Sequence, residues 1–154
     1  MKKVLQFIAS IMVPLLAGSL GSLFTVSKIA DWYQFLNKPS FNPPNWIFAP
    51  VWNILYILMG IALFLVIRSV NKYRKKAIYI FFAQLVINIT WSLVFFSLES
   101  PLWAFVTIIV LWILIWINIS YFYKVSKAAG WLLVPYLFWV SFAAVLNYAI
   151  LILN

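Results

Sequence analysis

The chain has 154 residues, of which 67% are hydrophobic, 20% aromatic and only 8% charged. Because soluble domains carry about 25% charged residues, this composition excludes a soluble globular domain. The net charge of +9 does not indicate a nucleic-acid partner, since the basic run is short and no folded basic face surrounds it.

Five long stretches of the sequence contain no charged residue. They are residues 4–27, 39–67, 77–98, 100–123 and 128–154. Each exceeds the roughly 20 residues that a helix needs to cross a bilayer core of about 30 Å. The stretches are continuously apolar, whereas the strands of a membrane β-barrel alternate between apolar and polar positions. The sequence therefore predicts an all-α integral membrane protein, a five-transmembrane-helix bundle that forms a single membrane domain over 1–154.

The first predicted helix covers about residues 4–27. Lys2 and Lys3 before a long apolar run would also fit a cleavable signal peptide. The uncharged run continues to Ser27, however, which is longer than the apolar region of such a peptide. We therefore interpret this segment as a transmembrane helix.

The second uncharged stretch is too long for one helix, and its first half contains Pro39, Pro43, Pro44 and Pro50. Proline lacks a backbone donor and is best tolerated in the first turn of a helix. We therefore predict an ordered loop over about 28–44 and a second helix over about 45–67.

The remaining three helices are expected at about 77–98, 101–123 and 130–153. Ser100 followed by Pro101 marks the start of the fourth helix, because serine is a preferred N-cap and proline fits the first helical position.

The basic residues predict the orientation of the bundle. With five spans, the N-terminus and the second and fourth loops share one side, which carries nine of the eleven Lys and Arg residues. The other side carries Lys28, Lys38 and both acids, Asp31 and Glu99. Because basic loops remain in the cytoplasm, we expect a cytoplasmic N-terminus and an outside C-terminus. The run 68–76 is also expected to contact anionic membrane lipid.

The inventory of reactive side chains excludes most catalytic chemistry. The chain has no His and no Cys, and its only carboxylates lie in the predicted loops. The residues required for zinc sites, His-activated nucleophiles and paired-carboxylate hydrolysis are therefore absent from the spans. The spans also lack the ionisable group that a proton-coupled pump needs. We predict no metal site and no cofactor. The interactions that remain available to a functional site are contacts with aromatic surface and hydrogen bonds to amides.

Polar residues within the third predicted helix form a stripe. Gln84, Asn88 and Ser92 follow a spacing of i, i+4, i+8 and so share one helix face. A bare amide facing lipid costs free energy, so this stripe should face the bundle interior, where Asn53 and Asn147 are placed to join it. One interpretation is that the amides only link helices, at about 0.6 to 2 kcal/mol per hydrogen bond.

The other interpretation is a ligand pocket in the outer half of the membrane. At a rise of 1.5 Å per residue, five residues fall at or beyond the midplane toward the outer side: Trp52, Asn88, Trp91, Phe142 and Ala143. Aromatic walls with a few amides would suit a flat ligand, and the proline-rich first loop would serve as a lid.

A series of motifs in this loop and in the helices that follow it covers essentially the whole chain: Trp32-Tyr33, Leu36, Lys38-Pro39-Ser40, Pro43-Pro44, Trp46, Phe48-Ala49-Pro50-Val51-Trp52, Leu55-Tyr56, Met59-Gly60, Gln84-Leu85, Asn88, Trp91, Phe95-Phe96, Pro135-Tyr136-Leu137, Trp139, Phe142-Ala143 and Leu146-Asn147-Tyr148. These motifs resemble those of the translocator protein family, also called the tryptophan-rich sensory protein or peripheral-type benzodiazepine receptor family.

The resemblance implies a five-helix bundle, often a homodimer, that binds porphyrins such as protoporphyrin IX and isoquinoline or benzodiazepine-type ligands. It also implies a bacterial member in the plasma membrane. The family's ligand positions correspond here to Ser22, Thr25, Tyr33, Pro43, Ala49, Trp52, Asn88, Trp91, Trp139, Ala143 and Leu146.

The function expected from the resemblance is that of a receptor-like porphyrin-binding protein in tetrapyrrole homeostasis or stress sensing. The alternatives are a light-dependent porphyrin-degrading protein, in which Trp52 and Trp139 would react, and a porphyrin transporter. The sterol motif of animal members is incomplete, because no basic residue follows Tyr148; sterol binding is therefore not predicted.

Overall fold

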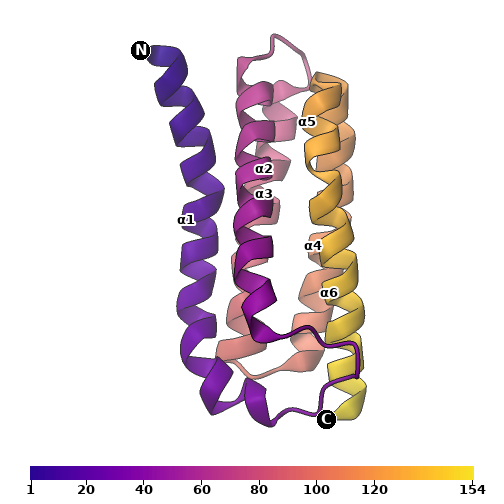
Figure 1. Cartoon of the computed structure of the whole chain (residues 1–154). Coiled ribbons are helices and arrows are strands. Elements are labelled where there is room, and N and C mark those ends of the chain that lie inside the picture. The colour runs from indigo at the N-terminus through magenta and orange to yellow at the C-terminus, as the bar shows by residue number, and fades with distance from the viewer.

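The computed structural model describes all 154 residues, and its helices form one bundle (Figure 1). The α-helices are α1 (Lys2–Asp31), α2 (Phe48–Arg68), α3 (Arg74–Ser92), α4 (Pro101–Val125), α5 (Lys127–Leu132) and α6 (Val134–Leu153), and there are no strands. Five helical segments are long and apolar enough to cross a membrane, with α5 and α6 together forming the fifth. The predicted all-α five-helix bundle is confirmed.

Several helix boundaries differ from the prediction by a few residues. α2 begins at Phe48 instead of residue 45, and α3 begins at Arg74 instead of residue 77.

The differences in the first and fifth spans have physical reasons. α1 continues to Asp31, past the predicted end at residue 27, because a charged residue can stay helical once it reaches the membrane surface, and Lys28 suits the last turn of a helix. The fifth span begins at Lys127 and is interrupted at Leu133. Pro135 explains the interruption, since its nitrogen cannot donate to the preceding turn.

Different segments of the chain lie at the two ends of the bundle. Figure 1 shows the N-terminus, the α2–α3 loop and the α4–α5 turn at one end, and the C-terminus with the 32–47 segment at the other. This segment, which we call the lid, contains the short 3-10 helices Tyr33–Phe35 and Asn45–Ile47. It crosses the open end of the bundle between α1 and α2 (Figure 1).

α1 packs on α2 through small residues. Its only buried residues are Ser10, Pro14, Ala17 and Gly21, a stripe that permits close helix approach. Gly60 of α2 lies at a point of close backbone contact, where an added Cβ would stand 2.5 Å from the Cα of Ile11 and 2.9 Å from the carbonyl oxygen of Ser10. The two helices can approach this closely only because residue 60 has no side chain.

We expect Gly60→Ala to lower the stability of the protein by about 1 to 3 kcal/mol, the usual cost of overpacking. The new methyl group meets the backbone of α1, which cannot rotate away. Gly21→Ala is the matched control, because the nearest atom there is the hydroxyl of Ser92 at 3.2 Å. Thermal unfolding in detergent measures both variants, and equal melting temperatures would contradict this account.

The end of α3 widens into a π-helix over Leu93–Ser97, where a continuous α-helix was predicted. This local change buries two consecutive aromatic residues, Phe95 and Phe96, which are 3% and 9% exposed. Their rings are 4.9 Å apart in an edge-on arrangement. π-turns occur frequently at functional sites, and this one supplies both rings to the cavity described next.

Candidate ligand-binding site

A cavity of about 410 Å³ lies inside the bundle. Its lining residues come from α1, the lid, α2, α3 with its π-helix, and α6, but not from α4 or α5. The volume falls within the roughly 300 to 1,000 Å³ that small-molecule sites occupy. The cavity therefore combines the size of a ligand site with a cover formed by the lid.

Aromatic rings form the cavity walls on α2, α3 and α6. Trp52 stacks on Tyr56, with ring centroids 5.4 Å apart. On α3, the rings of Trp91 and Phe95 are 5.4 Å apart and nearly parallel. The ring of Trp139 on α6 meets Phe48 edge-on at 5.9 Å. These planar surfaces can hold a flat aromatic ligand by stacking.

The α1 wall combines small residues with aliphatic ones, and its hydroxyl groups are already bonded. Ser22 donates to the carbonyl of Ser19 at 2.7 Å, and Thr25 donates to the carbonyl of Gly21 at 3.1 Å. Such bonds to the preceding turn are typical of Ser and Thr within helices. α1 thus contributes space to the cavity, while its hydroxyl groups are not free to donate to a ligand.

Buried polar side chains tie three helices together next to the cavity. The hydroxyl of Tyr56 donates to Asn88 Oδ1 at 2.9 Å, and Asn88 Nδ2 donates to the hydroxyl of Tyr136 at 3.0 Å. Tyr136 in turn donates to Gln84 Oε1 at 2.9 Å. Asn88 lines the cavity, yet its amide also links α2, α3 and α6, so both interpretations of the polar stripe apply to this residue.

The two other predicted members of the stripe behave differently. Asn147 accepts from Trp91 Nε1 at 3.1 Å and donates to the carbonyl of Pro101 at 3.0 Å. Asn53 lines the cavity but bonds neither Gln84 nor Asn88. Asn147 therefore fixes the orientation of the Trp91 ring, which is one of the aromatic walls.

Trp139 presents a hydrogen-bond donor without a partner. Its Nε1 is buried and unbonded, as is Nε2 of Gln84. An unbonded buried donor costs about 1 to 3 kcal/mol, and Trp139 belongs to the cavity lining, whereas Gln84 does not. A ligand acceptor that reached this indole N–H would offset that cost.

Tyr33 holds the lid in place. It is 6% exposed and packs on Phe95 and Phe96 with ring centroids 6.2 and 5.8 Å away. Its hydroxyl donates to Asn42 Oδ1 at 2.9 Å. Burial raises the pKa of Tyr33, and the bond to Asn42 offsets this only in part. The hydroxyl therefore stays protonated up to at least the usual tyrosine pKa of about 10, and this bond persists at neutral pH.

The lid is also fastened to the end of α6 and lies beside an ion pair. The backbone nitrogen of Asn37 donates to Asn154 Oδ1 at 2.9 Å, and Asn154 Nδ2 donates to the carbonyl of Asn37 at 3.0 Å. Lys28 of α1 pairs with Glu99 at 2.7 Å. Opening the lid therefore requires breaking several polar contacts.

The structure gathers ten of the eleven sequence-predicted site residues around one cavity. They are Ser22, Thr25, Tyr33, Ala49, Trp52, Asn88, Trp91, Trp139, Ala143 and Leu146. Pro43 is not among the lining residues; its carbonyl accepts from Asn42 Nδ2 at 3.1 Å within the lid. Phe142 is not among them either, and its ring packs on Trp139 and Phe41.

Sequence reasoning did not assign Tyr56 and Tyr136 to the polar network. The signal that would have found them is their position, since a tyrosine deep in an apolar helix needs a partner for its hydroxyl. No group of three or more His, Cys, Asp or Glu side chains gathers in the structure, so the cavity walls offer no such cluster to a metal ion.

Comparison with known proteins connects this geometry to a family. A sequence model of the TspO/MBR family matches residues 10–153. The tryptophan-rich protein TspO of Archaeoglobus fulgidus is 45% identical over 153 residues, which is 98% of each chain. The tryptophan-rich sensory protein of Cereibacter sphaeroides is 35% identical over 150 residues, 97% of this chain and 90% of its own.

An animal protein is also similar. The translocator protein of Homo sapiens is 34% identical over 142 residues, covering 90% of this chain and 84% of its own. The similarity thus covers nine-tenths or more of the chain in both microbial and animal relatives.

Proposed function

The chain belongs to the TspO/MBR family and is an integral membrane protein of the sensory and translocator type; we propose that its cavity binds porphyrins such as protoporphyrin IX. Isoquinoline and benzodiazepine-type ligands are proposed to occupy the same cavity. The physiological role would then be receptor-like, in tetrapyrrole homeostasis or stress sensing.

The observation that supports this proposal is the pair of tryptophans in the cavity wall. Trp52 and Trp139 both line a space of about 410 Å³, from α2 and α6 respectively. Stacked aromatic contacts are worth about 0.5 to 1.5 kcal/mol each beyond the burial of area. A flat macrocycle is the ligand shape that gains most from such walls.

The chemistry of the lining favours a metal-free porphyrin over haem. Tight haem binding rests on axial ligands, chiefly His or Cys, and the chain contains neither. Protoporphyrin IX should therefore bind at least as tightly as haem.

Titration of the purified protein in detergent tests the proposal. The Soret absorbance of protoporphyrin IX should change saturably, haem should bind no more tightly, and an isoquinoline ligand should compete. The absence of a saturable change with protoporphyrin would overturn the proposal.

Light-dependent degradation of the porphyrin is a second candidate. Its support is that oxidisable side chains lie against each other in the cavity wall, with Trp52 stacked on Tyr56 at 5.4 Å. Irradiation of the complex in air should then yield products more slowly in Trp52→Phe and Trp139→Phe. Unchanged product formation with retained binding would remove the tryptophans from this chemistry.

A porphyrin transporter is the third candidate. It would show porphyrin flux in proteoliposomes without ion coupling.

The N-terminus is proposed to lie in the cytoplasm of a bacterial cell and the C-terminus outside the plasma membrane. The chain has no Cys, so a single introduced thiol reports its own side. A membrane-impermeant maleimide added to spheroplasts should label Ser40→Cys in the lid and not Ala128→Cys in α5, both of which are exposed positions. The reverse pattern would invert the topology.

The homodimer implied by the resemblance is likewise a proposal. Light scattering of the purified protein in detergent, corrected for bound detergent, should give twice the mass of 17.9 kDa. A monomeric mass would contradict it.

A further inference from the structure

We propose that three lysines at the N-terminal end of the bundle form a binding site for the phosphate headgroup of an anionic phospholipid. The lysines are Lys72, Lys76 and Lys124, and they surround two tyrosines, Tyr73 and Tyr121. This site lies at the opposite end of the bundle from the lid, and the proposal does not depend on what the cavity binds.

The ammonium groups converge on one pair of rings. Tyr73 and Tyr121 meet edge-on with ring centroids 6.1 Å apart. Lys72 Nζ lies 5.0 Å from the centroid of Tyr73, and Lys76 Nζ lies 4.8 Å from that of Tyr121. Lys124 Nζ lies over both rings, at 5.4 and 5.1 Å. Two segments distant in sequence, residues 72–76 around the start of α3 and the end of α4, thus bring their positive charges together.

The backbone around this cluster is held by Asn71. Its Nδ2 donates to the carbonyl of Lys124 at 3.1 Å, and its Oδ1 accepts from the backbone nitrogen of Tyr73 at 2.8 Å. The α2–α3 loop is thereby tied to the end of α4. The backbone positions from which the lysines extend are consequently fixed relative to one another by the fold.

The charges of the cluster have no carboxylate to balance them. The chain has only two acidic residues, and Glu99 pairs with Lys28 at the other end of the bundle. Like charges held close together repel one another, and a surface of one sign attracts ions of the other. The cluster is therefore complementary to an anion.

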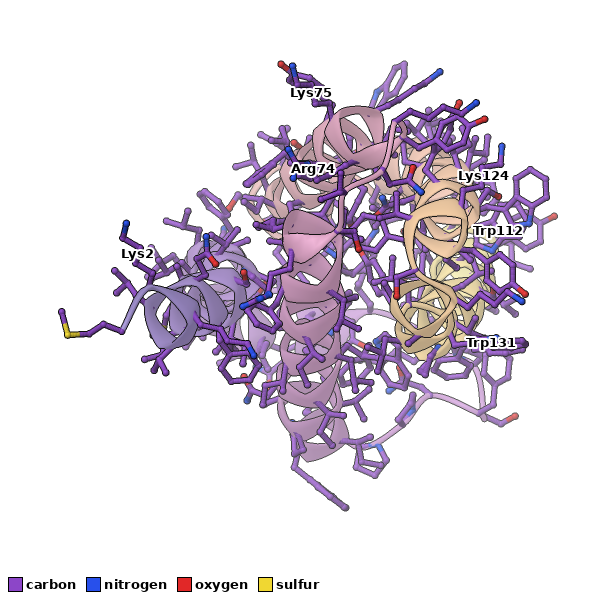
Figure 2. All side chains as sticks on the ribbon, turned by 90° about the horizontal axis from the view of Figure 1, so that it is seen from above. Lys2, Arg74, Lys75, Trp112, Lys124 and Trp131 are labelled. Carbon is purple, nitrogen blue, oxygen red and sulfur yellow. The ribbon has the colours of Figure 1, made fainter.

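Other basic residues at this end are placed differently. Arg74 donates to the carbonyls of Ile67 and Ser69 at 3.4 and 3.1 Å, so it caps the end of α2. Seen from above in Figure 2, Lys75 projects away from the bundle, and Lys2 on α1 lies apart from Lys124. Arg74, Lys75 and Lys2 thus do not join the three converging lysines.

The position of the cluster in the membrane selects a lipid headgroup as the occupant. The third span begins at Arg74 and the fourth ends at Val125, so the lysines stand where these helices leave the hydrocarbon. Lipid phosphates lie at this level, and tyrosines favour it. Anionic lipid also attracts basic residues next to a span.

Native mass spectrometry tests the site on the full chain in detergent, using equal amounts of dioleoyl phosphatidylglycerol and dioleoyl phosphatidylcholine as probes. The wild type should retain phosphatidylglycerol in preference to phosphatidylcholine. Each basic contact contributes about fivefold, so Lys76→Gln/Lys124→Gln should lose roughly 25-fold of this preference. The control variant Lys75→Gln/Lys127→Gln removes the same amount of charge at the same end of the bundle, and it should keep most of the preference for phosphatidylglycerol.

Three outcomes would overturn the proposal. Equal losses in the two double variants would show that net charge alone attracts the lipid. The variant Lys76→Arg/Lys124→Arg keeps the charges, so a loss of the lipid preference in this variant would show that the substitutions act through the local fold. Displacement of the lipid by inorganic phosphate at millimolar concentration would assign the site to free phosphate.

Discussion

Trp52→Ala is expected to weaken the binding of protoporphyrin IX by roughly a hundredfold. Trp52 lines the cavity and is held between Tyr56 and Tyr136, with ring centroids 5.4 and 6.1 Å away. Its loss removes one stacking surface, worth about 0.5 to 1.5 kcal/mol, and about 1.5 to 3 kcal/mol of aromatic burial. A total near 3 kcal/mol corresponds to about a hundredfold in Kd.

Trp103→Ala provides the matched control for this experiment. Trp103 lies near the start of α4, at the same end of the bundle as the cavity, but it is 64% exposed and outside the lining. The Soret titration should give the control the affinity of the wild type, with Trp52→Phe between the control and Trp52→Ala. An affinity of Trp52→Ala within about threefold of the wild type would remove Trp52 from the proposed site.

The membrane helices could be predicted from the sequence because charge is expensive in hydrocarbon. Gaps between charged residues therefore locate the spans, and the observed bundle has five of them. The exact ends of the helices are less well determined by the gaps between charged residues. α1 continues to Asp31 because charged residues can remain helical at the membrane surface, and the π-helix at Leu93–Ser97 depends on tertiary packing of two phenylalanines.

The cavity could be predicted in part. Helix depth placed five residues at or beyond the midplane; Trp52, Asn88, Trp91 and Ala143 line the cavity, whereas Phe142 does not. Hydrogen-bond partners were beyond this reasoning, because they depend on how helices are rotated against one another. Asn147 shows the difficulty, since its amide donates to the backbone carbonyl of Pro101, an acceptor that no side-chain pattern reveals.

The hydrogen-bond network is expected to contribute more to stability than any other polar feature inside the bundle. Asn88 is 4% exposed and bonds Tyr56 of α2 and Tyr136 of α6. Interhelical hydrogen bonds in membrane proteins are worth about 0.6 to 2 kcal/mol each, and the hydroxyls of Tyr56 and Tyr136, which are buried, would lose these partners. Asn88→Ala should therefore lower the stability of the protein by about 2 to 4 kcal/mol.

Asn53→Ala is the matched control, because Asn53 also lines the cavity but makes no bond to the network. Its melting temperature in detergent should equal that of the wild type, whereas that of Asn88→Ala should fall. The cycle formed by Tyr56→Phe, Asn88→Ala and their double variant isolates the bond between these residues, because contacting pairs give non-additive effects. Additive losses, or an unchanged melting temperature in Asn88→Ala, would mean that Asn88 serves the cavity surface alone and that packing of the apolar side chains holds the three helices together.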